Sequence, residues 1–226
     1  MISLRNVSKS YSSKNKVLQM VNLIIEPGEF VSIVGQSGAG KTTLVRVLIG
    51  EERVDAGQVM IGDWDITKIS KREVPYLRRQ IGVIFQDFKL LPKKTLEENV
   101  SFALEVSGGR PAKIKKIVPS VLKIVGLQDK KQRYPNEVSG GEQQRAAIAR
   151  ALIHQPKILL ADEPTGNLDA INANEIIDLL LRINKFGTTV ILVTHNKEIV
   201  NRLNRRVVTM EQGQIISDQA HGKYLL

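Results

Sequence analysis

The sequence predicts an α/β domain with a mainly parallel sheet, to which an N-terminal antiparallel β layer and an inserted helical subdomain are added. Short apolar, β-branched runs recur along the 226 residues and alternate with helical patterns. That alternation is typical of parallel strands buried between helices. Residues 1–30 are instead divided by turns, and residues 88–150 interrupt the strand rhythm with mostly helical sequence.

The antiparallel layer is predicted from two segments, 1–30 and 57–66. Both have the pattern of short strands, and each contains a turn pair, Pro27-Gly28 in the first and Gly62-Asp63 in the second. Strands that follow one another through tight turns pair antiparallel. We therefore expect these segments to form a separate β layer beside the core.

Four nearly continuous apolar runs predict the strands of the core. They occupy residues 30–34, 81–85, 158–161 and 190–193. A strand that is buried on both faces has no need of polar residues at alternate positions, so such runs favour a parallel sheet covered by helices.

Helical periodicity is clearest in residues 114–125 and 176–183. Apolar residues recur there at the spacing of a helix with one buried face. We expect Pro119 to start or kink the first helix and Gly187 to end the second. The core with its β layer is assigned to about residues 1–87 and 151–226, and the helical subdomain to about residues 88–150.

The composition bounds the class of protein. The chain is 42% hydrophobic and 25% charged, as in ordinary soluble globular proteins, and it has no cysteine for a disulfide framework or thiolate chemistry. No apolar run approaches a membrane span, and the N-terminus lacks the apolar region of a secretory signal. The net charge of +10 suggests an anionic partner, but the basic residues are scattered, which equally fits a solvated surface.

A phosphate-binding motif follows the first core strand. The pattern G-x-x-x-x-G-K-S/T is matched in full between a predicted strand and the helical run 44–49. Glycines let backbone N–H groups converge on phosphate oxygens, Lys41 supplies a charge for the β- and γ-phosphates, and the Thr42 hydroxyl is a Mg²⁺ ligand. The motif predicts a P-loop NTPase core that binds a nucleoside triphosphate with Mg²⁺. The expected binding residues are Gly35, Gln36, Ser37, Gly38, Ala39, Gly40, Lys41, Thr42 and Thr43.

Two acids and a histidine end neighbouring core strands. Asp162 closes the run 158–161 and is placed to orient Mg²⁺. Glu163 follows it and points away from it, so we expect Glu163 to polarise an attacking water as general base. His195 ends the run 190–193 at the same edge of the sheet, which favours a γ-phosphate contact.

The order of these motifs resembles that of the ATP-binding-cassette (ABC) ATPases, and the resemblance covers essentially the whole chain. Between the P-loop and the acidic pair lies a Ser-Gly-Gly-Glu segment, and a Gly-Asn-Leu-Asp segment follows the pair. The residues that carry the resemblance are the P-loop, Gln86, Ser139-Gly140-Gly141-Glu142-Gln143, Asp162-Glu163, Gly166-Asn167-Leu168-Asp169 and His195.

The resemblance implies a homodimer that sandwiches two ATP molecules. The Ser-Gly-Gly-Glu segment of one chain would cap the γ-phosphate held by the P-loop of the other, with a helix N-terminus facing the anion. It also implies that Tyr11 stacks on adenine, that Asp169 contacts the partner's P-loop and that His195 holds the γ-phosphate. The expected catalytic residues are Glu163, His195 and Gln86, the expected Mg²⁺ ligands are Thr42, Gln86 and Asp162, and the residues acting on the partner's ATP are Ser139, Gly140, Gly141 and Glu142.

The resemblance further implies an integral membrane partner, whose cytoplasmic helix the family docks near residues 87–100. The amino-acid sequence of residues 88–106 and 162–169 is similar to that of the family branch that acts in bacterial cell division. Members of that branch lie at the cytoplasmic face of the membrane, and their partner is thought to control peptidoglycan hydrolysis. ATPases for lipoprotein release and for macrolide or peptide efflux share the sequence of residues 162–169, so the ATPase subunit of such a transporter is an open alternative to the cell-division function. A third is an ABC ATPase acting on nucleic acid, although no nucleic-acid partner is expected.

Overall fold

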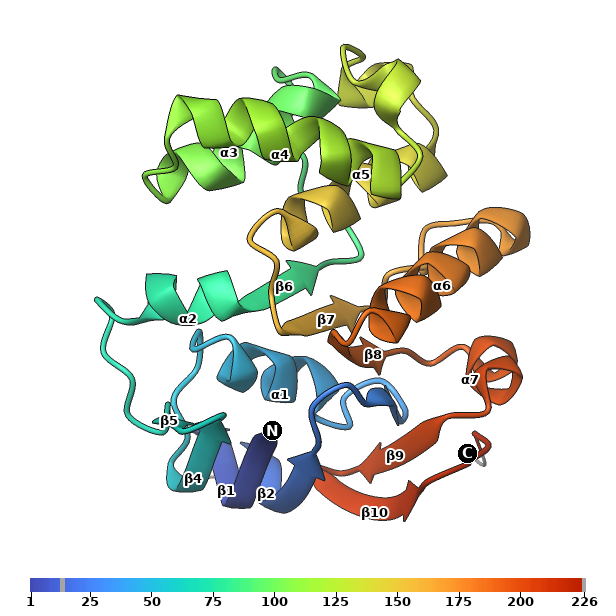
Figure 1. Ribbon diagram of the computed structural model, residues 1–226. Helices are drawn as coiled ribbons and strands as arrows, with labels where there is room; N and C mark the ends of the chain where they lie inside the picture. Colours follow the sequence, from blue (N-terminus) through green and yellow to red (C-terminus); the bar gives the residue numbers. More distant parts are fainter. Residues whose placement is uncertain (13–14, 225–226) are drawn as a thin grey trace.

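The computed structural model describes residues 1–12 and 15–224, which form two sheets and a group of helices (Figure 1). The predicted antiparallel layer is a four-stranded sheet in the order β2-β1-β4-β5. It contains β1 (Ile2–Ser12), β2 (Asn15–Ile25), β4 (Ala56–Ile61) and β5 (Trp64–Asp65). β1 and β2 are longer than the short strands expected, because they pair with each other along nearly their whole length.

The second sheet is the core, in the order β10-β9-β3-β8-β7-β6. The four predicted core strands are all present and parallel: β3 (Phe30–Val34), β6 (Ile81–Ile84), β7 (Ile158–Asp162) and β8 (Thr189–Val193). Ligands of such sheets bind outside the carboxyl ends of the strands. The residues that directly follow these strands are therefore gathered at one edge.

Two strands at the end of the core sheet were not predicted. β9 (Arg206–Glu211) lies parallel to β3, and β10 (Gln214–Gln219) returns antiparallel to β9. β10 alternates exposed and half-buried residues at the sheet edge, so it has no continuous apolar run. Its sequence therefore lacks the signal that marks a buried parallel strand.

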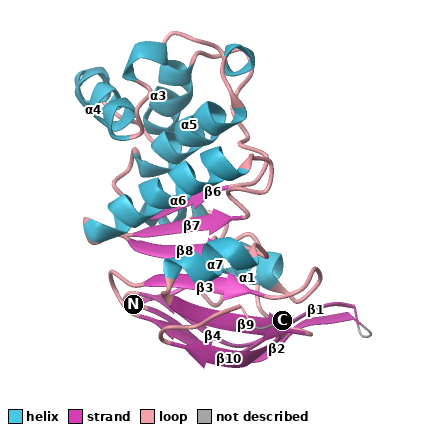
Figure 2. Cartoon of the chain, turned by 90° about the vertical axis from the view of Figure 1, so that its right-hand side faces the viewer, coloured by secondary structure: helices cyan, strands magenta, loops and turns pink. Residues whose placement is uncertain are grey.

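The helices fall into two groups (Figures 1 and 2). Beside the core sheet lie α1 (Lys41–Leu48), α2 (Val74–Gln80), α6 (Ala170–Lys185) and α7 (Lys197–Leu203). At one end of the molecule gather α3 (Leu96–Val106), α4 (Pro111–Ile124), α5 (Gly140–Leu152) and the 3-10 helices η1 (Gln128–Lys130) and η2 (Pro135–Glu137).

The start of α4 differs from the prediction. The helix begins at Pro111 and passes through Pro119, so Pro119 does not start it. Proline is favoured in the first turn because its missing N–H has no helical partner there. The first turn of α4 is exposed and basic and has little apolar periodicity, so the apolar pattern did not predict where the helix begins.

Two large hydrophobic clusters hold the sheets and helices together. One fills the space between the two sheets around α1, and the other lies between the core sheet and α3 to α6. β8 contributes Ile191 to the first cluster and Leu192 to the second, and both side chains are fully buried. This is the two-sided burial that its apolar run predicts. Within residues 1–12 and 15–224, no helix combines the length and hydropathy that a membrane crossing needs.

Candidate functional site

The P-loop leaves the carboxyl end of β3 and runs directly into α1. Gly40 is the N-cap of α1, with φ of 100°, and a Cβ there would lie 2.6 Å from the carbonyl oxygen of Val17. Only glycine fits this position. Gln36, Ser37 and Gly38 are exposed, so the loop and the first N–H groups of α1 are open to an anion.

Lys41 folds back over the P-loop. Its Nζ donates to the carbonyl oxygens of Gly35 at 2.7 Å and Gln36 at 2.9 Å. Burial lowers the pKa of Lys41, and the negative charges of Glu163 and Asp162 oppose that shift. The loop therefore already holds a cation in place, and phosphate oxygens would compete with two carbonyls for its N–H groups.

Asp162 ends β7 in the neighbourhood of that cation. Burial and the charge of Glu163 raise the pKa of Asp162, whereas Lys41 and Arg46 act in the opposite direction. A carboxylate that is costly to ionise gains most from a nearby cation. Asp162, Glu163 and Lys41 thus form one electrostatic group at the carboxyl edge of the sheet.

Glu163 and His195 are in direct contact. Oε1 of Glu163 lies 2.7 Å from Nδ1 of His195, and Oε2 accepts a hydrogen bond from the Thr194 hydroxyl at 3.2 Å. The main-chain N–H of Glu163 donates to Val193 O at 2.9 Å. The structure therefore brings together two of the three predicted catalytic residues, from the ends of β7 and β8.

Gln86 follows β6 at the same edge. Its Nε2 donates to Oδ1 of Asn167 at 3.3 Å, and Nδ2 of Asn167 donates to the carbonyl oxygen of Gln86 at 3.2 Å. Asn167 was missed as a site residue. The sequence signal for Asn167 was its position between the acidic pair and Asp169. Its hydrogen-bond partner Gln86 lies 81 positions away, so the pairing cannot be found from residue spacing.

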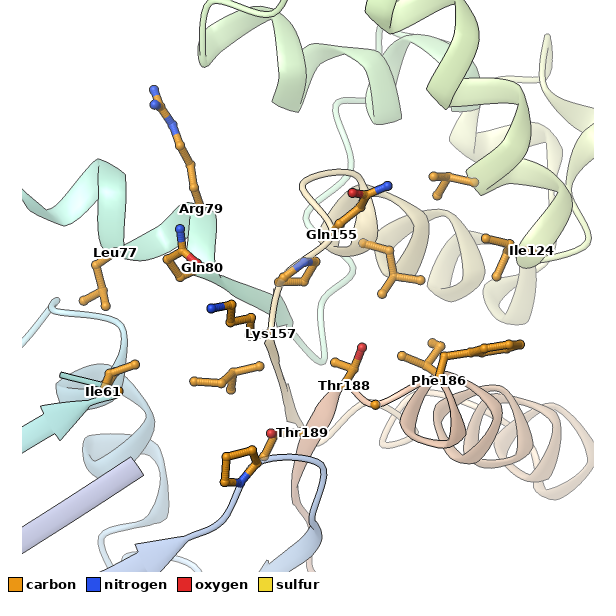
Figure 3. Close-up of a pocket in the computed structure, with 18 of the residues that line it drawn as sticks. Ile61, Leu77, Arg79, Gln80, Ile124, Gln155, Lys157, Phe186, Thr188 and Thr189 are labelled. Carbon is orange, nitrogen blue, oxygen red and sulfur yellow. The ribbon is translucent and has the colours of Figure 1, made fainter. Parts of the chain in front are cut away.

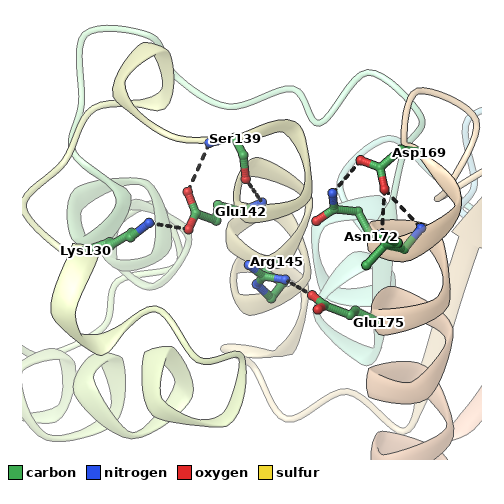
Figure 4. A network of polar contacts seen from close by, with 8 residues as sticks. Lys130, Ser139, Glu142, Arg145, Asp169, Asn172 and Glu175 are labelled. Carbon is green, nitrogen blue, oxygen red and sulfur yellow. Dashed lines mark hydrogen bonds and ion pairs between the residues drawn. The ribbon is translucent and has the colours of Figure 1, made fainter.

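The Ser-Gly-Gly-Glu segment opens helix α5. Ser139 is the N-cap, and its hydroxyl accepts from the Glu142 N–H at 3.3 Å (Figure 4). Glu142 accepts from the Ser139 N–H at 3.0 Å and pairs with Lys130 at 2.5 Å. Burial opposes ionisation of Glu142, but the hydrogen bonds from Lys130 and Ser139 outweigh it and lower the pKa. This capping box fixes the segment at a solvent-exposed helix N-terminus.

Asp169 caps α6 beside that segment (Figure 4). Its carboxylate accepts N–H bonds from Asn172 at 2.9 Å and Ile171 at 3.0 Å, and these bonds, led by that from Asn172, lower the pKa of Asp169. Arg145 and Glu175 join α5 to α6 at 2.7 Å. The start of α5 is therefore fixed against α6.

The Ser-Gly-Gly-Glu segment and the P-loop are separated within one chain. The polar contacts of Ser139 and Glu142 go to each other and to Lys130. Figure 1 shows α5 with the upper group of helices, and α1 lies on the other side of the core strands. The structure does not bring the two predicted phosphate-binding segments into one site.

Tyr11 lies near the end of β1 and is 48% exposed. The Nζ atom of Lys9 lies 5.5 Å from the centre of its ring. The ring therefore keeps much of its surface available, and its stacking on adenine stays a prediction.

A groove of about 1710 Å³ lies at the opposite edge, where the core strands begin (Figure 3). Ile124 and Phe186 line it together with the cationic Arg79 and Lys157. No P-loop residue lines it. The groove is therefore separate from the candidate nucleotide site.

Comparison with known proteins agrees with the motifs. Residues 18–166 match the family model described as ABC transporter. Over 223 residues the chain is 50% identical to the cell division ATP-binding protein FtsE of Streptococcus pneumoniae serotype 2 (strain D39 / NCTC 7466), covering 99% of this chain and 97% of the relative.

Solved structures extend the agreement to the fold. The dimeric post-hydrolysis state of the ATP-binding cassette MJ0796, bound to ADP and Pi, is 34% identical with a TM-score of 0.87, covering 99% of this chain and 100% of that chain. CbiO1 from Clostridium perfringens, part of the ABC transporter complex cbiONQ, is 31% identical with a TM-score of 0.89. The match covers 97% of this chain and 88% of the CbiO1 chain. The resemblance inferred from the motifs is confirmed: the chain belongs to the ABC transporter family and is an ATPase.

Proposed function

We propose that this chain is the ATPase subunit of a bacterial cell-division complex and pairs with an integral membrane protein resembling FtsX. The observation that carries the proposal is the 50% identity to FtsE over 99% of the chain. In this proposal the ATPase lies on the cytoplasmic face of the membrane. Its ATP-driven conformational change passes to the membrane partner, which controls peptidoglycan hydrolysis.

ATP binding is assigned to the P-loop and Tyr11. The exposed loop residues and the first turn of α1 provide N–H groups for the phosphates. Lys41 moves its hydrogen bonds from Gly35 O and Gln36 O to the β- and γ-phosphates. Tyr11 provides an aromatic face for adenine.

Mg²⁺ fits the oxygen atoms gathered at this edge. Mg²⁺ prefers oxygen ligands and is usually held by few protein groups together with substrate phosphates. Thr42, Asp162 and Gln86 offer a hydroxyl, a carboxylate and a carboxamide oxygen, and no cluster of three His, Asp or Glu side chains occurs in residues 1–12 and 15–224. When bound, Mg²⁺ neutralises phosphate charge and orients the γ-phosphate.

Hydrolysis is assigned to Glu163 as the base that polarises the attacking water. The contact between Glu163 Oε1 and His195 Nδ1 holds both groups at the end of the sheet. His195 would contact the γ-phosphate through its exposed ring, and Gln86 would hold Mg²⁺ and the attacking water. Proton removal by a positioned carboxylate typically contributes about 10²- to 10⁴-fold in rate.

A homodimer completes each ATP site. The Ser-Gly-Gly-Glu segment (residues 139–142) opens α5, whereas the P-loop opens α1 on the other side of the core strands, and the N-terminus of α5 is open to a second chain. The dimeric state of the similar cassette MJ0796 supports this arrangement. ATP then bridges two chains, and its hydrolysis removes the bridge.

The membrane partner is assigned to the surface that follows Gln86. On α3, Phe102 is 38% and Val106 68% exposed, although both are large apolar side chains. Asn99 is fully buried and fixes the preceding loop by accepting from Leu91 N–H at 2.7 Å and donating to Lys94 O at 3.0 Å. The surface thus presents two exposed apolar side chains among charged ones such as Lys93 and Glu98, beside a loop that is held in one shape.

The test is co-purification of the Glu163→Gln variant from detergent-solubilised membranes in Mg²⁺-ATP. The variant should keep ATP without hydrolysing it and so hold its partner in the ATP-bound state. Lys41→Ala, treated identically, is the control that cannot form this state. Mass spectrometry then identifies the proteins recovered with Glu163→Gln but not with Lys41→Ala.

The molecules recovered with the variant decide between three functions. A membrane protein with few spans and a large extracytoplasmic region, recovered with division proteins, supports the proposal. A lipoprotein-release or efflux permease would replace cell division by transport and leave the ATPase chemistry unchanged. Nucleic acid alone would contradict the membrane partner.

A further inference from the structure

Gln86 and Asn167 exchange two hydrogen bonds across the carboxyl edge of the core sheet. Asn167 Nδ2 donates to the main-chain oxygen of Gln86 at 3.2 Å, and Gln86 Nε2 donates to Asn167 Oδ1 at 3.3 Å. Gln86 follows β6, and Asn167 lies between β7 and α6. The pair therefore joins the ends of two neighbouring strands.

This pairing determines how both carboxamide groups are turned. A main-chain carbonyl oxygen only accepts hydrogen bonds, so Asn167 must present its Nδ2 to it. Oδ1 of Asn167 then faces the Gln86 side chain, and only Nε2 of Gln86 can donate to it. Asn167 thus engages the nitrogen end of the Gln86 carboxamide and leaves Oε1 unengaged.

The surroundings hold this pair from both sides. The loop carrying Asn167 contains two turns, closed by Gly166 N–H to Glu163 O and Leu168 N–H to Thr165 O, each at 3.1 Å. A Cβ at Gly166 would lie 2.9 Å from Gln86 Nε2, so a side chain there would displace the carboxamide.

On the other side, Arg150 fixes the residues that follow Gln86. Its guanidinium donates to Phe88 O at 2.8 Å and to Lys89 O at 2.5 Å. Phe88 and Lys89 both have φ of 50°, which is rare for two consecutive residues with side chains. The backbone around Gln86 is therefore held in one conformation before any ligand arrives.

We propose that Asn167 is a positioning residue for Gln86, holding the carboxamide so that its oxygen is presented to Mg²⁺ and the attacking water. The inference rests on the role proposed for Gln86. Mg²⁺ takes oxygen ligands, and a reversed carboxamide would offer it two N–H donors instead. Asn167 acts through Gln86 and touches neither the nucleotide nor the metal.

The experiment measures binding of Mn²⁺, a paramagnetic substitute for Mg²⁺, by electron paramagnetic resonance. All chains carry Glu163→Gln and are saturated with ATP, so that hydrolysis does not intervene. The added changes are Gln86→Ala, Asn167→Ala, both together, and Asn167→Asp. Asn174→Ala is the matched control, because Asn174 is an exposed asparagine on α6 whose side chain contacts Arg202.

Gln86→Ala and Asn167→Ala should each weaken Mn²⁺ binding about tenfold, as loss of a residue that orients a metal ligand commonly does. The double variant should match the single ones, because both changes remove the same oriented oxygen. Asn167→Asp keeps the side-chain size but lacks the N–H group and places a carboxylate against Gln86 O, so it should also weaken binding. ATP affinity without metal and the Asn174→Ala control should be unchanged.

Three results would overturn the proposal. Wild-type Mn²⁺ binding in Asn167→Ala, together with weakened binding in Gln86→Ala, would show that Asn167 does not position Gln86, although Gln86 itself contributes to metal binding. Wild-type binding in Gln86→Ala would remove that role and this inference with it. Additive losses in the double variant would show that the two residues act independently.

Discussion

Glu163 has a left-handed backbone, with φ of 49°, at the point where β7 ends. For a residue with a side chain this conformation costs about 1–2 kcal/mol relative to the right-handed region. The Glu163 N–H bond to Val193 O and the contact of its carboxylate with His195 offset that cost. The strain lies at the residue assigned to catalysis, which is where proteins commonly retain it.

Asp162 provides the first prediction. Its pKa is raised, chiefly by burial, so the unfolded chain ionises this carboxyl more readily than the folded chain does. Its contribution to stability is therefore present at low pH and is lost as pH rises through its folded pKa. Asp162→Asn removes the charge, so we expect ATPase activity to fall and stability at pH 7 to rise by about 1 kcal/mol, which is about 2–4 °C in Tm.

Calorimetry as a function of pH tests this prediction. The gain in Tm should shrink as pH falls, because the wild-type carboxyl is then protonated in both states. Asp63→Asn, at an exposed turn, is the control and should leave Tm nearly unchanged. A lower Tm for Asp162→Asn at pH 7 would contradict the assignment of an unfavourable buried charge.

At the scale of the element, α5 connects three separated parts of the molecule. Its N-cap Ser139 opens the segment assigned to the partner's ATP. One turn later, Gln144 donates to Pro164 O at 2.6 Å, next to Glu163, and is fully buried. Near its end, Arg150 binds Phe88 O and Lys89 O in the segment assigned to the membrane partner. A movement of α5 would therefore reach all three.

Arg150→Met tests the last of these connections. The side chain keeps much of its apolar contact but loses both donors, so the strained segment after Gln86 should open more often. We expect amide hydrogen exchange in residues 87–91 to accelerate about tenfold or more, while exchange in α1 and ATP affinity stay unchanged. Arg133→Met, at an exposed position, is the control. Equal exchange in both variants would mean that Arg150 does not hold this segment.

Ser139→Arg tests the start of α5. A bulky cation there would block the approach of a second chain but would leave the distant P-loop intact. We expect ATP affinity of the single chain to be unchanged and ATP-dependent dimerisation, measured by light scattering, to be lost. Normal dimerisation of this variant would show that the Ser-Gly-Gly-Glu segment does not act on a second chain.

The elements differ in how well the sequence revealed them. The four buried core strands were found because two-sided burial demands continuous apolar runs. β10 was missed because its edge position lets polar residues alternate with half-buried ones. The P-loop and the acids at strand ends follow from local chemistry. The pairing of Gln86 with Asn167 does not, since only the folded sheet brings two strand ends together.

For the whole molecule, the separation of α1 from α5 means that, in the proposed function, two chains must associate before ATP is hydrolysed. The Glu163→Gln chain should therefore form an ATP-dependent dimer that persists, because the bridging nucleotide is not hydrolysed. Size-exclusion chromatography with Mg²⁺-ATP should show a dimer for this variant and a monomer without nucleotide. Lys41→Ala should stay monomeric in both conditions, and a persistent monomer of Glu163→Gln would contradict the bridging role of ATP.

The same separation means that damage to one half of a site can be repaired by another molecule. Lys41→Ala inactivates the P-loop and leaves Ser139 intact. Ser139→Arg inactivates the Ser-Gly-Gly-Glu segment and leaves the P-loop intact, so a pair of identical variant chains has no complete site. A mixed pair contains one site built from both undamaged halves. At its other site the bulky side chain introduced by Ser139→Arg faces the Lys41→Ala P-loop, which holds no nucleotide and so leaves room for it. Co-refolding the two inactive chains in equal amounts should restore about a quarter of the wild-type ATPase activity, as intersubunit complementation. Absence of any recovery would contradict the completion of each ATP site by a second chain.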